Sequence, residues 1–158
     1  MKFRNKIIKK EFDDFKKYHK NIYNVIFHIV CGFAYMSFFF SLFRDYKNIA
    51  LSVYFLLLLM TVNLMSAVLI CIPIYYIINN VISFSPNNIY IFLLFYFLPE
   101  LSHYLTKEKT VLNIKNITSF SLFSNIFYLL PFSIQCLFNT TKSKSRPIKN
   151  NMKNKDNK

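Results

Sequence analysis

The residues of this chain best suited to chemistry are its three histidines, His19, His28 and His103, each at or just inside the end of a long apolar stretch. Neutral imidazole is the commonest transition-metal ligand in proteins. Ionisable side chains at membrane depth are costly, which makes them candidates for function. A lone histidine at such a boundary is more often structural. Three together, with few other polar groups nearby, predict a shared metal site.

His19 and His28 can share a metal only if the chain breaks between them. On one continuous helix their side chains would lie about 13 Å apart and on opposite faces. Asn21 and Asn24 supply the means to break it, because asparagine is a good capping and turn residue. We expect a helix that ends near His19, a turn at Asn21 and a membrane span that starts near Asn24. This path folds His19 back toward His28.

Three further polar side chains are candidates for the same site. Asn24 shares a helix face with His28 and could orient an imidazole, since a ligand histidine needs a partner on its other ring nitrogen. Glu100 shares a face with His103. Glu108, or Glu100 by its facing, could be a fourth ligand or a base. A solvated or salt-bridged helix-end role is an open alternative for each glutamate.

The stretches that carry these residues are apolar enough to lie in a membrane. Hydrophobic residues make up 54% of the chain and charged residues 17%. No charged residue occurs from Asn48 to Pro99, and uncharged stretches also run from Asn21 to Phe43 and from Asn116 to Thr141. A soluble domain seldom does this, because some turns must face water, whereas a bilayer span needs about 20 apolar residues. The pattern predicts an all-α, polytopic membrane bundle.

We expect about four spans and a last apolar segment. Residues 49–84 as one helix would be about 54 Å long, well beyond a hydrocarbon core of about 30 Å. They should form two short spans with a turn near Asn63–Ser66, or one tilted span and an interfacial piece. The last apolar stretch contains Pro131 and either spans or re-enters the same face. The predicted parts are an interfacial helix (1–20), a transmembrane domain (21–138, with spans near 24–43 and 89–105) and a basic disordered tail (139–158).

The N-terminal segment has the pattern of an amphipathic helix. Its apolar residues recur at helical spacing, with lysines over much of the remaining surface. A basic helix of this kind suits a position flat on the membrane interface. His19, four residues after Phe15, falls on the apolar stripe and should point toward the membrane or the protein body. The stripe consists of Phe3, Ile7, Ile8, Phe12 and Phe15.

The positive charge is concentrated at the two ends of the chain. The sequence has 20 Lys and Arg and a formal net charge of +13. Basic residues beside a membrane favour the cytosolic face and attract anionic lipid headgroups. Nucleic-acid binding is the competing interpretation, but the charge flanks an apolar body, so no nucleic-acid partner is expected. The three cysteines fit neither a disulfide framework nor a CxxC metal pair.

The segment YHKNIYNVIFH, Tyr18–His28, resembles the first motif of a small family of membrane-embedded 2-hydroxy fatty acid dioxygenases. The family is known for the metabolism of phytosphingosine to odd-numbered fatty acids. Its two histidines and two asparagines fall in register here. Ser102–Lys109 resembles the second motif, Gly-His followed by Glu-Lys and a proline. Ile22 stands where the family has proline, Ser102 replaces glycine, Glu108 comes one residue late and the later proline is missing.

The resemblance implies a non-haem Fe(II) enzyme that uses O2 to shorten a 2-hydroxy fatty acid by one carbon at the endoplasmic reticulum membrane. His19, His28 and His103 would be the metal ligands, and a lipid substrate would enter sideways from the bilayer. The alternative is a non-catalytic membrane protein, either a degenerate relative or a lipid-binding or assembly subunit. A transporter or channel is disfavoured, because no charged residue lies in the middle of a span.

Topology gives this hypothesis an internal test. A shared metal requires the three histidines on one side of the membrane. With a cytosolic N-terminus, the span that ends near His103 must return to the cytosol. That requires four crossings before Lys107, two of them within residues 49–84, and it makes the basic loop after His103 cytosolic, as the positive-inside rule predicts. One crossing within 49–84 would place His103 on the far side.

Overall fold

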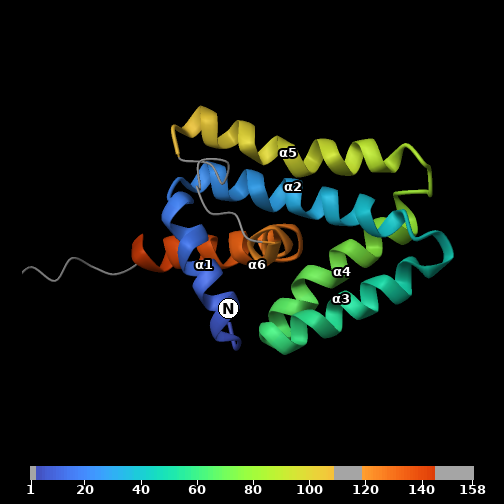
Figure 1. The fold of residues 1–158 in the computed structure, drawn as a ribbon, viewed down its shortest axis with the longest axis horizontal. Helices are drawn as coiled ribbons and strands as arrows, with labels where there is room; N and C mark the ends of the chain where they lie inside the picture. The colour runs from blue at the N-terminus through green and yellow to red at the C-terminus, as the bar shows by residue number, and fades with distance from the viewer. Residues whose placement is uncertain (1–2, 109–118, 145–158) are drawn as a thin grey trace, which may run out of the picture.

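The chain folds into helices joined by short turns (Figure 1). The computed structural model describes residues 3–108 and 119–144, and over that part of the chain it contains no strand, as the all-α prediction requires. The elements are α1 (Lys6–Tyr18), α2 (Ile22–Ser41), the 3-10 helix η1 (Arg44–Tyr46), α3 (Lys47–Thr61), α4 (Leu64–Asn80), α5 (Asn88–Thr106) and α6 (Ser119–Lys144).

Asparagine side chains set the start of several helices. Asn5 accepts hydrogen bonds from the N–H groups of the first turn of α1, Asn21 does so for α2, and Asn63 for α4. These bonds satisfy N–H groups that have no partner inside the helix. Two of the predicted breaks are thereby confirmed: the chain turns at Asn21, and residues 49–84 form two helices that separate at Asn63.

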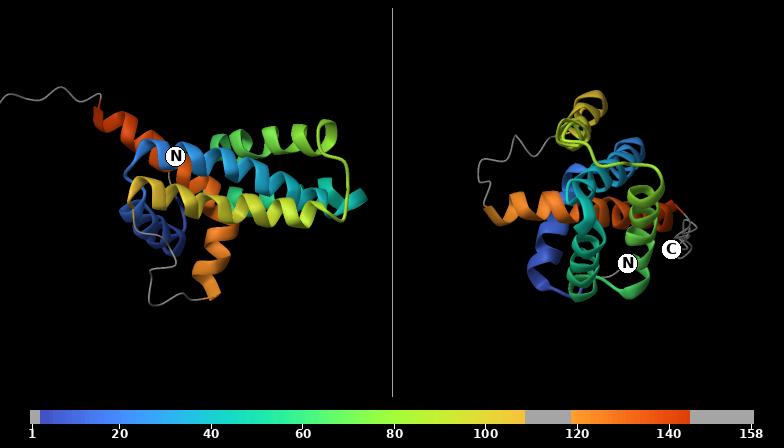
Figure 2. Two further views of the ribbon diagram at one scale, coloured as in Figure 1. Left: turned by 90° about the horizontal axis from the view of Figure 1, so that it is seen from above. Right: turned by 90° about the vertical axis from the view of Figure 1, so that its right-hand side faces the viewer.

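Helix α2 is the centre of the fold. It packs against α5, α6, α4 and α3, and α5 runs beside it (Figures 1 and 2). The approach of α6 depends on Gly32, where an added Cβ would lie 3.1 Å from Leu130 Cδ1. Large side chains that are fully buried line these contacts: Tyr35, Met36, Phe40, Leu58, Ile70, Ile74, Ile78, Tyr128, Leu130 and Phe132.

The apolar stripe of α1 packs on the protein. The ring centroids of Phe12 and Phe15 lie 5.7 and 5.5 Å from that of Phe132 in α6, and Ile8 is buried with them. Of the two surfaces that this stripe could face, the membrane and the protein body, Ile8, Phe12 and Phe15 face the protein body. Aromatic side chains gain most by full burial against other rings, and α6 offers such a surface. Ile7, 58% exposed, stays outside this contact.

Helix α6 is bent, as its path in Figure 2 shows, and Pro131 lies inside it. Proline lacks the N–H that would complete the helical ladder and crowds the preceding turn, which is a common cause of a bend. The helix continues to Lys144, so the prediction of an irregular tail from residue 139 is wrong for residues 139–144. Residues 145–158, and Lys109 and Lys115 of the basic loop, lie outside the described residues.

Two of the described helices, α2 and α5, are long and apolar enough to cross a membrane. Helices α3 and α4 have 15 and 17 residues, and at about 1.5 Å per residue they reach roughly 22 and 25 Å, short of a hydrocarbon core of about 30 Å. Many large apolar side chains on all four helices are exposed, among them Val30, Val53, Ile72 and Phe97.

Candidate metal centre

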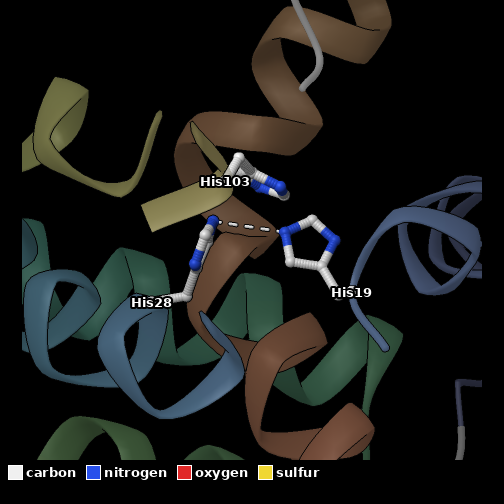
Figure 3. A group of neighbouring side chains, drawn as sticks. All are labelled: His19, His28 and His103. Carbon is white, nitrogen blue, oxygen red and sulfur yellow. Dashed lines mark hydrogen bonds between the residues drawn. The ribbon is translucent and has the colours of Figure 1, made fainter. Parts of the chain in front are cut away.

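The reversal of the chain between α1 and α2 brings His19 onto His28. Helix α1 ends at Tyr18, and α2 begins at Ile22 under the cap of Asn21. Within this short turn His19 folds back, so that its Nε2 lies 3.2 Å from Nε2 of His28 (Figure 3). The ring of Phe15 stacks on the ring of His19, with centroids 3.6 Å apart and an interplanar angle of 10°.

His103 completes the group from the last turns of α5 (Figure 3). Its ring centroid lies 4.6 Å from that of His19 and 4.9 Å from that of His28, with the rings close to perpendicular. One ring nitrogen from each histidine lies within 4.8 Å of the others, and all three side chains are buried. The three histidines that the sequence analysis singled out form one cluster that could hold a metal ion.

The hydrogen bonds of two rings define which nitrogens are open. His19 Nδ1 donates to the carbonyl oxygen of Phe15 at 2.7 Å, and His28 Nδ1 donates to the carbonyl oxygen of Asn24 at 2.9 Å. A carbonyl oxygen can only accept, so each Nδ1 carries the hydrogen of its neutral ring. The two Nε2 atoms at 3.2 Å therefore face each other with lone pairs, an unfavourable contact unless a cation lies between them.

A metal ion fits this gap better than a proton does. Two nitrogens bound to one ion by bonds of about 2.0–2.1 Å lie roughly 2.8–3.4 Å apart, from right-angle to tetrahedral geometry. The observed 3.2 Å falls in that range. Burial, and next the neighbouring His28, lower the pKa of His19 far below its ordinary value. A proton on His19 is thus disfavoured near neutral pH, whereas transition metals bind the neutral ring.

Asn24 connects the cluster to its surroundings. Its Nδ2 lies 3.2 Å from His103 Nδ1 and donates to Glu108 Oε2 at 2.6 Å, while its Oδ1 accepts from the hydroxyl of Ser102. With an N–H facing Nδ1, the neutral His103 ring carries its hydrogen on Nε2. A half-turn of the amide would present Oδ1 instead, move that hydrogen to Nδ1 and open Nε2. With Nδ2 facing His103, neither ring nitrogen offers a free lone pair to a metal, and the half-turn that would open Nε2 would also remove the hydrogen bond from Asn24 to Glu108.

The two glutamates considered for the site do not belong to the group of ring nitrogens that lie within 4.8 Å of one another. Glu108 Oε1 accepts from the backbone N–H groups of Lys20 and Asn21 at 2.7 and 2.8 Å. Glu100 lies about one helical turn before His103 in α5. Among the described residues, the group that could hold a metal ion at this place consists of imidazoles and includes neither carboxylate.

Sequence reasoning missed two sets of hydrogen bonds at the site, one made by Asn24 and one made by Glu108. Ser102 was noted only as a substitution for glycine, yet its buried hydroxyl holds the amide oxygen. A polar residue next to His103 in an apolar helix was the available signal. The second set joins Glu108 to the backbone N–H groups of Lys20 and Asn21, for which side-chain patterns give no signal.

Comparison of the chain with protein-family models, with characterised proteins and with solved structures finds no match.

Proposed function

We propose that the protein is a membrane-embedded dioxygenase that binds Fe(II) through His19, His28 and His103 and acts on 2-hydroxy fatty acids. The observation that carries the proposal is the pair of Nε2 lone pairs that face each other at 3.2 Å beside His103. The resemblance of Tyr18–His28 to the family motif favours iron and a 2-hydroxy fatty acid over other metals and substrates.

The donor set suits this chemistry. Three neutral imidazoles leave coordination positions open, and Fe(II) bound there would supply the activation of O2. The cluster contributes no negative charge to a bound divalent ion, so the ion would keep its attraction for a carboxylate, which a 2-hydroxy fatty acid carries beside its hydroxyl. The balanced reaction converts R–CH(OH)–COOH and O2 to R–COOH, CO2 and water.

The protein residues around the cluster would orient the ligands and exclude water. Phe15 covers one face of the His19 ring, and the carbonyl oxygens of Phe15 and Asn24 fix two of the rings in the tautomer that leaves Nε2 open. Such partners on the far side of ligand imidazoles set ring orientation and ligand basicity. Leu101, Tyr104 and Leu105, exposed on α5 close to His103, favour a lipid that approaches from the bilayer.

The arrangement of the helices supports one-sided placement of the cluster. Helix α2 leads away from it and α5 returns to it, while the α3–α4 hairpin begins and ends at the far end of α2 (Figure 1). The number of crossings before His103 is even, two or four, whether or not the short hairpin helices span. We propose an integral membrane protein of the endoplasmic reticulum with a cytosolic N-terminus, whose basic ends contact anionic lipid headgroups.

The test uses the full chain purified in detergent, metal analysis, and incubation with a 2-hydroxy fatty acid under O2. The wild type should contain iron and form the fatty acid that is one carbon shorter. His28→Ala should lose at least tenfold in bound iron and in product, because only two imidazoles remain to bind the ion. Tyr90→Ala is the matched control, because Tyr90 is 70% exposed at the other end of α5. Iron that persists when each histidine is replaced contradicts the proposal, and bound iron without product favours the non-catalytic alternative.

A further inference from the structure

We infer that Glu108 is a positioning residue that latches the turn carrying His19 to the end of the helix carrying His103. Its carboxylate joins segments that are 87 and 88 residues apart in the chain. The consequence for metal binding rests on the proposed function, but the latch itself is a matter of hydrogen bonds within the protein.

The carboxylate is fully engaged by the other segment. Oε1 accepts from the N–H groups of Lys20 and Asn21, and Oε2 accepts from the side chain of Asn24. The two backbone groups lie between the end of α1 and the start of α2. A negative charge there also interacts favourably with the N-terminal end of the α2 dipole. Hydrogen bonds to a charged acceptor are stronger than those between neutral groups.

The backbone after α5 directs Glu108 toward this turn. Lys107 ends the helix in the left-handed conformation, with φ of 57°, and its N–H bonds to the carbonyl oxygen of Tyr104. The N–H of Glu108 then bonds to the carbonyl oxygen of His103 at 3.0 Å. This closed helix end folds the chain back. The left-handed backbone of a non-glycine residue such as Lys107 costs about 1 kcal/mol or more in conformational strain. The same turn that closes α5 thus delivers the carboxylate to α2.

The latch explains how His19 is held. His19 lies on a turn, next to Lys20, and its ring must meet one ring from α2 and another from α5. Without the carboxylate, the N–H groups of Lys20 and Asn21 and the amide of Asn24 lose their shared acceptor. We expect the turn to loosen from α5, which would weaken the cluster although all three histidines remain.

Two variants separate a latch from a ligand. Glu108→Gln keeps a carbonyl oxygen for the two backbone N–H groups, and its new amide can donate to Asn24 once that amide turns over. Glu108→Ala keeps none of these bonds. In titrations of the full chain with Co(II), followed by the visible absorption of the ion, Glu108→Ala should bind at least tenfold more weakly and Glu108→Gln within about threefold of the wild type. Tyr90→Ala, exposed at the other end of α5, is the control.

Amide hydrogen exchange tests the latch without any metal. In the metal-free protein the amides of Lys20 and Asn21 should exchange at least tenfold faster in Glu108→Ala than in the wild type. Glu108→Gln and Tyr90→Ala should keep the wild-type protection. Where Glu108→Ala does not fold, Glu108→Asp replaces it, since a side chain shorter by one methylene cannot reach both partners.

The outcomes distinguish the two ideas. A wild type that binds no Co(II) would sink the proposed function, while the exchange rates would still decide on the latch. Equal protection of Lys20 and Asn21 in wild type and Glu108→Ala would overturn the latch. So would Glu108→Gln with protected amides and a tenfold loss of Co(II) affinity, because that combination identifies the carboxylate as a ligand.

Discussion

Asn24 serves two histidines with two different groups. Its backbone carbonyl oxygen accepts a hydrogen bond from His28 Nδ1, and its side-chain amide nitrogen contacts His103 Nδ1. The amide is held in turn by Ser102 and Glu108. A buried polar group left without a partner costs about 1–3 kcal/mol, so each of these contacts constrains the others. Asn24 is consequently the residue at which a small chemical change should have the largest effect on the cluster.

Moving the negative charge from Glu108 to position 24 tests the contact between Asn24 and Glu108. Asn24→Asp can still accept from Ser102 and from His103, but its charge repels Glu108. We expect it to lower the free energy of unfolding by about 2 kcal/mol, within the range for an uncompensated buried charge contact. Adding Glu108→Gln provides an amide donor for Asp at position 24 and should recover at least half of that loss.

The measurement is a double-mutant cycle of unfolding free energies in detergent. Residues in one hydrogen-bond network couple by about 0.5–3 kcal/mol. Additive effects of the two substitutions would contradict the direct contact between Asn24 and Glu108. Asn80→Asp is a matched control, because Asn80 is exposed and its side chain bonds only within its own helix turn in the described contacts.

At the scale of the elements, the contact between α2 and α6 depends on the only glycine of the chain, Gly32. An added Cβ would lie 3.1 Å from Cδ1 and 3.3 Å from Cβ of Leu130. Alanine gains about 1 kcal/mol of helix propensity over glycine, which opposes the tight contact. We expect Gly32→Ala to change the unfolding free energy by less than about 1 kcal/mol.

A larger side chain at the same position should be costly. Gly32→Leu forces α6 away from α2, and overpacking of this kind costs about 1–3 kcal/mol. Because Leu130 is the neighbour, the double variant with Leu130→Ala should be more stable than Gly32→Leu alone. Thermal unfolding in detergent measures all three. No recovery in the double variant would mean that Leu130 is not what limits the approach of α6.

The sequence predicted the helices with regular patterns better than it predicted their partners. The bounds of α2 and α5, the break at Asn63 and the turn at Asn21 follow from apolar length and capping chemistry, which are local. The docking of the α1 stripe on Phe132 could not be predicted, because an apolar stripe suits lipid and protein equally. The role of Glu108 depends on the left-handed backbone of Lys107 and on a partner 87 residues away in the chain.

At the scale of the whole molecule, the path of the helices predicts which surfaces share a side of the membrane. The end of the bundle that holds the three histidines carries Lys20 and Lys107. The opposite end carries Asp45 and Asn87, and all four residues are exposed. In sealed vesicles, single cysteines at 20 and 107 should react with an impermeant reagent from one side, and those at 45 and 87 from the other. The native cysteines are buried and should contribute little. Opposite accessibility of positions 20 and 107 would contradict both the even number of crossings and the shared site.

Helix α5 supplies one member of the cluster, yet among the described helices it packs chiefly on α2. The α1, α3, α4 and α6 helices make their main contacts elsewhere, so the placement of His103 beside His28 depends chiefly on this one interface. The most extensive helix–helix contact among the described residues thus carries one histidine of the cluster on each of its two sides, His28 on α2 and His103 on α5.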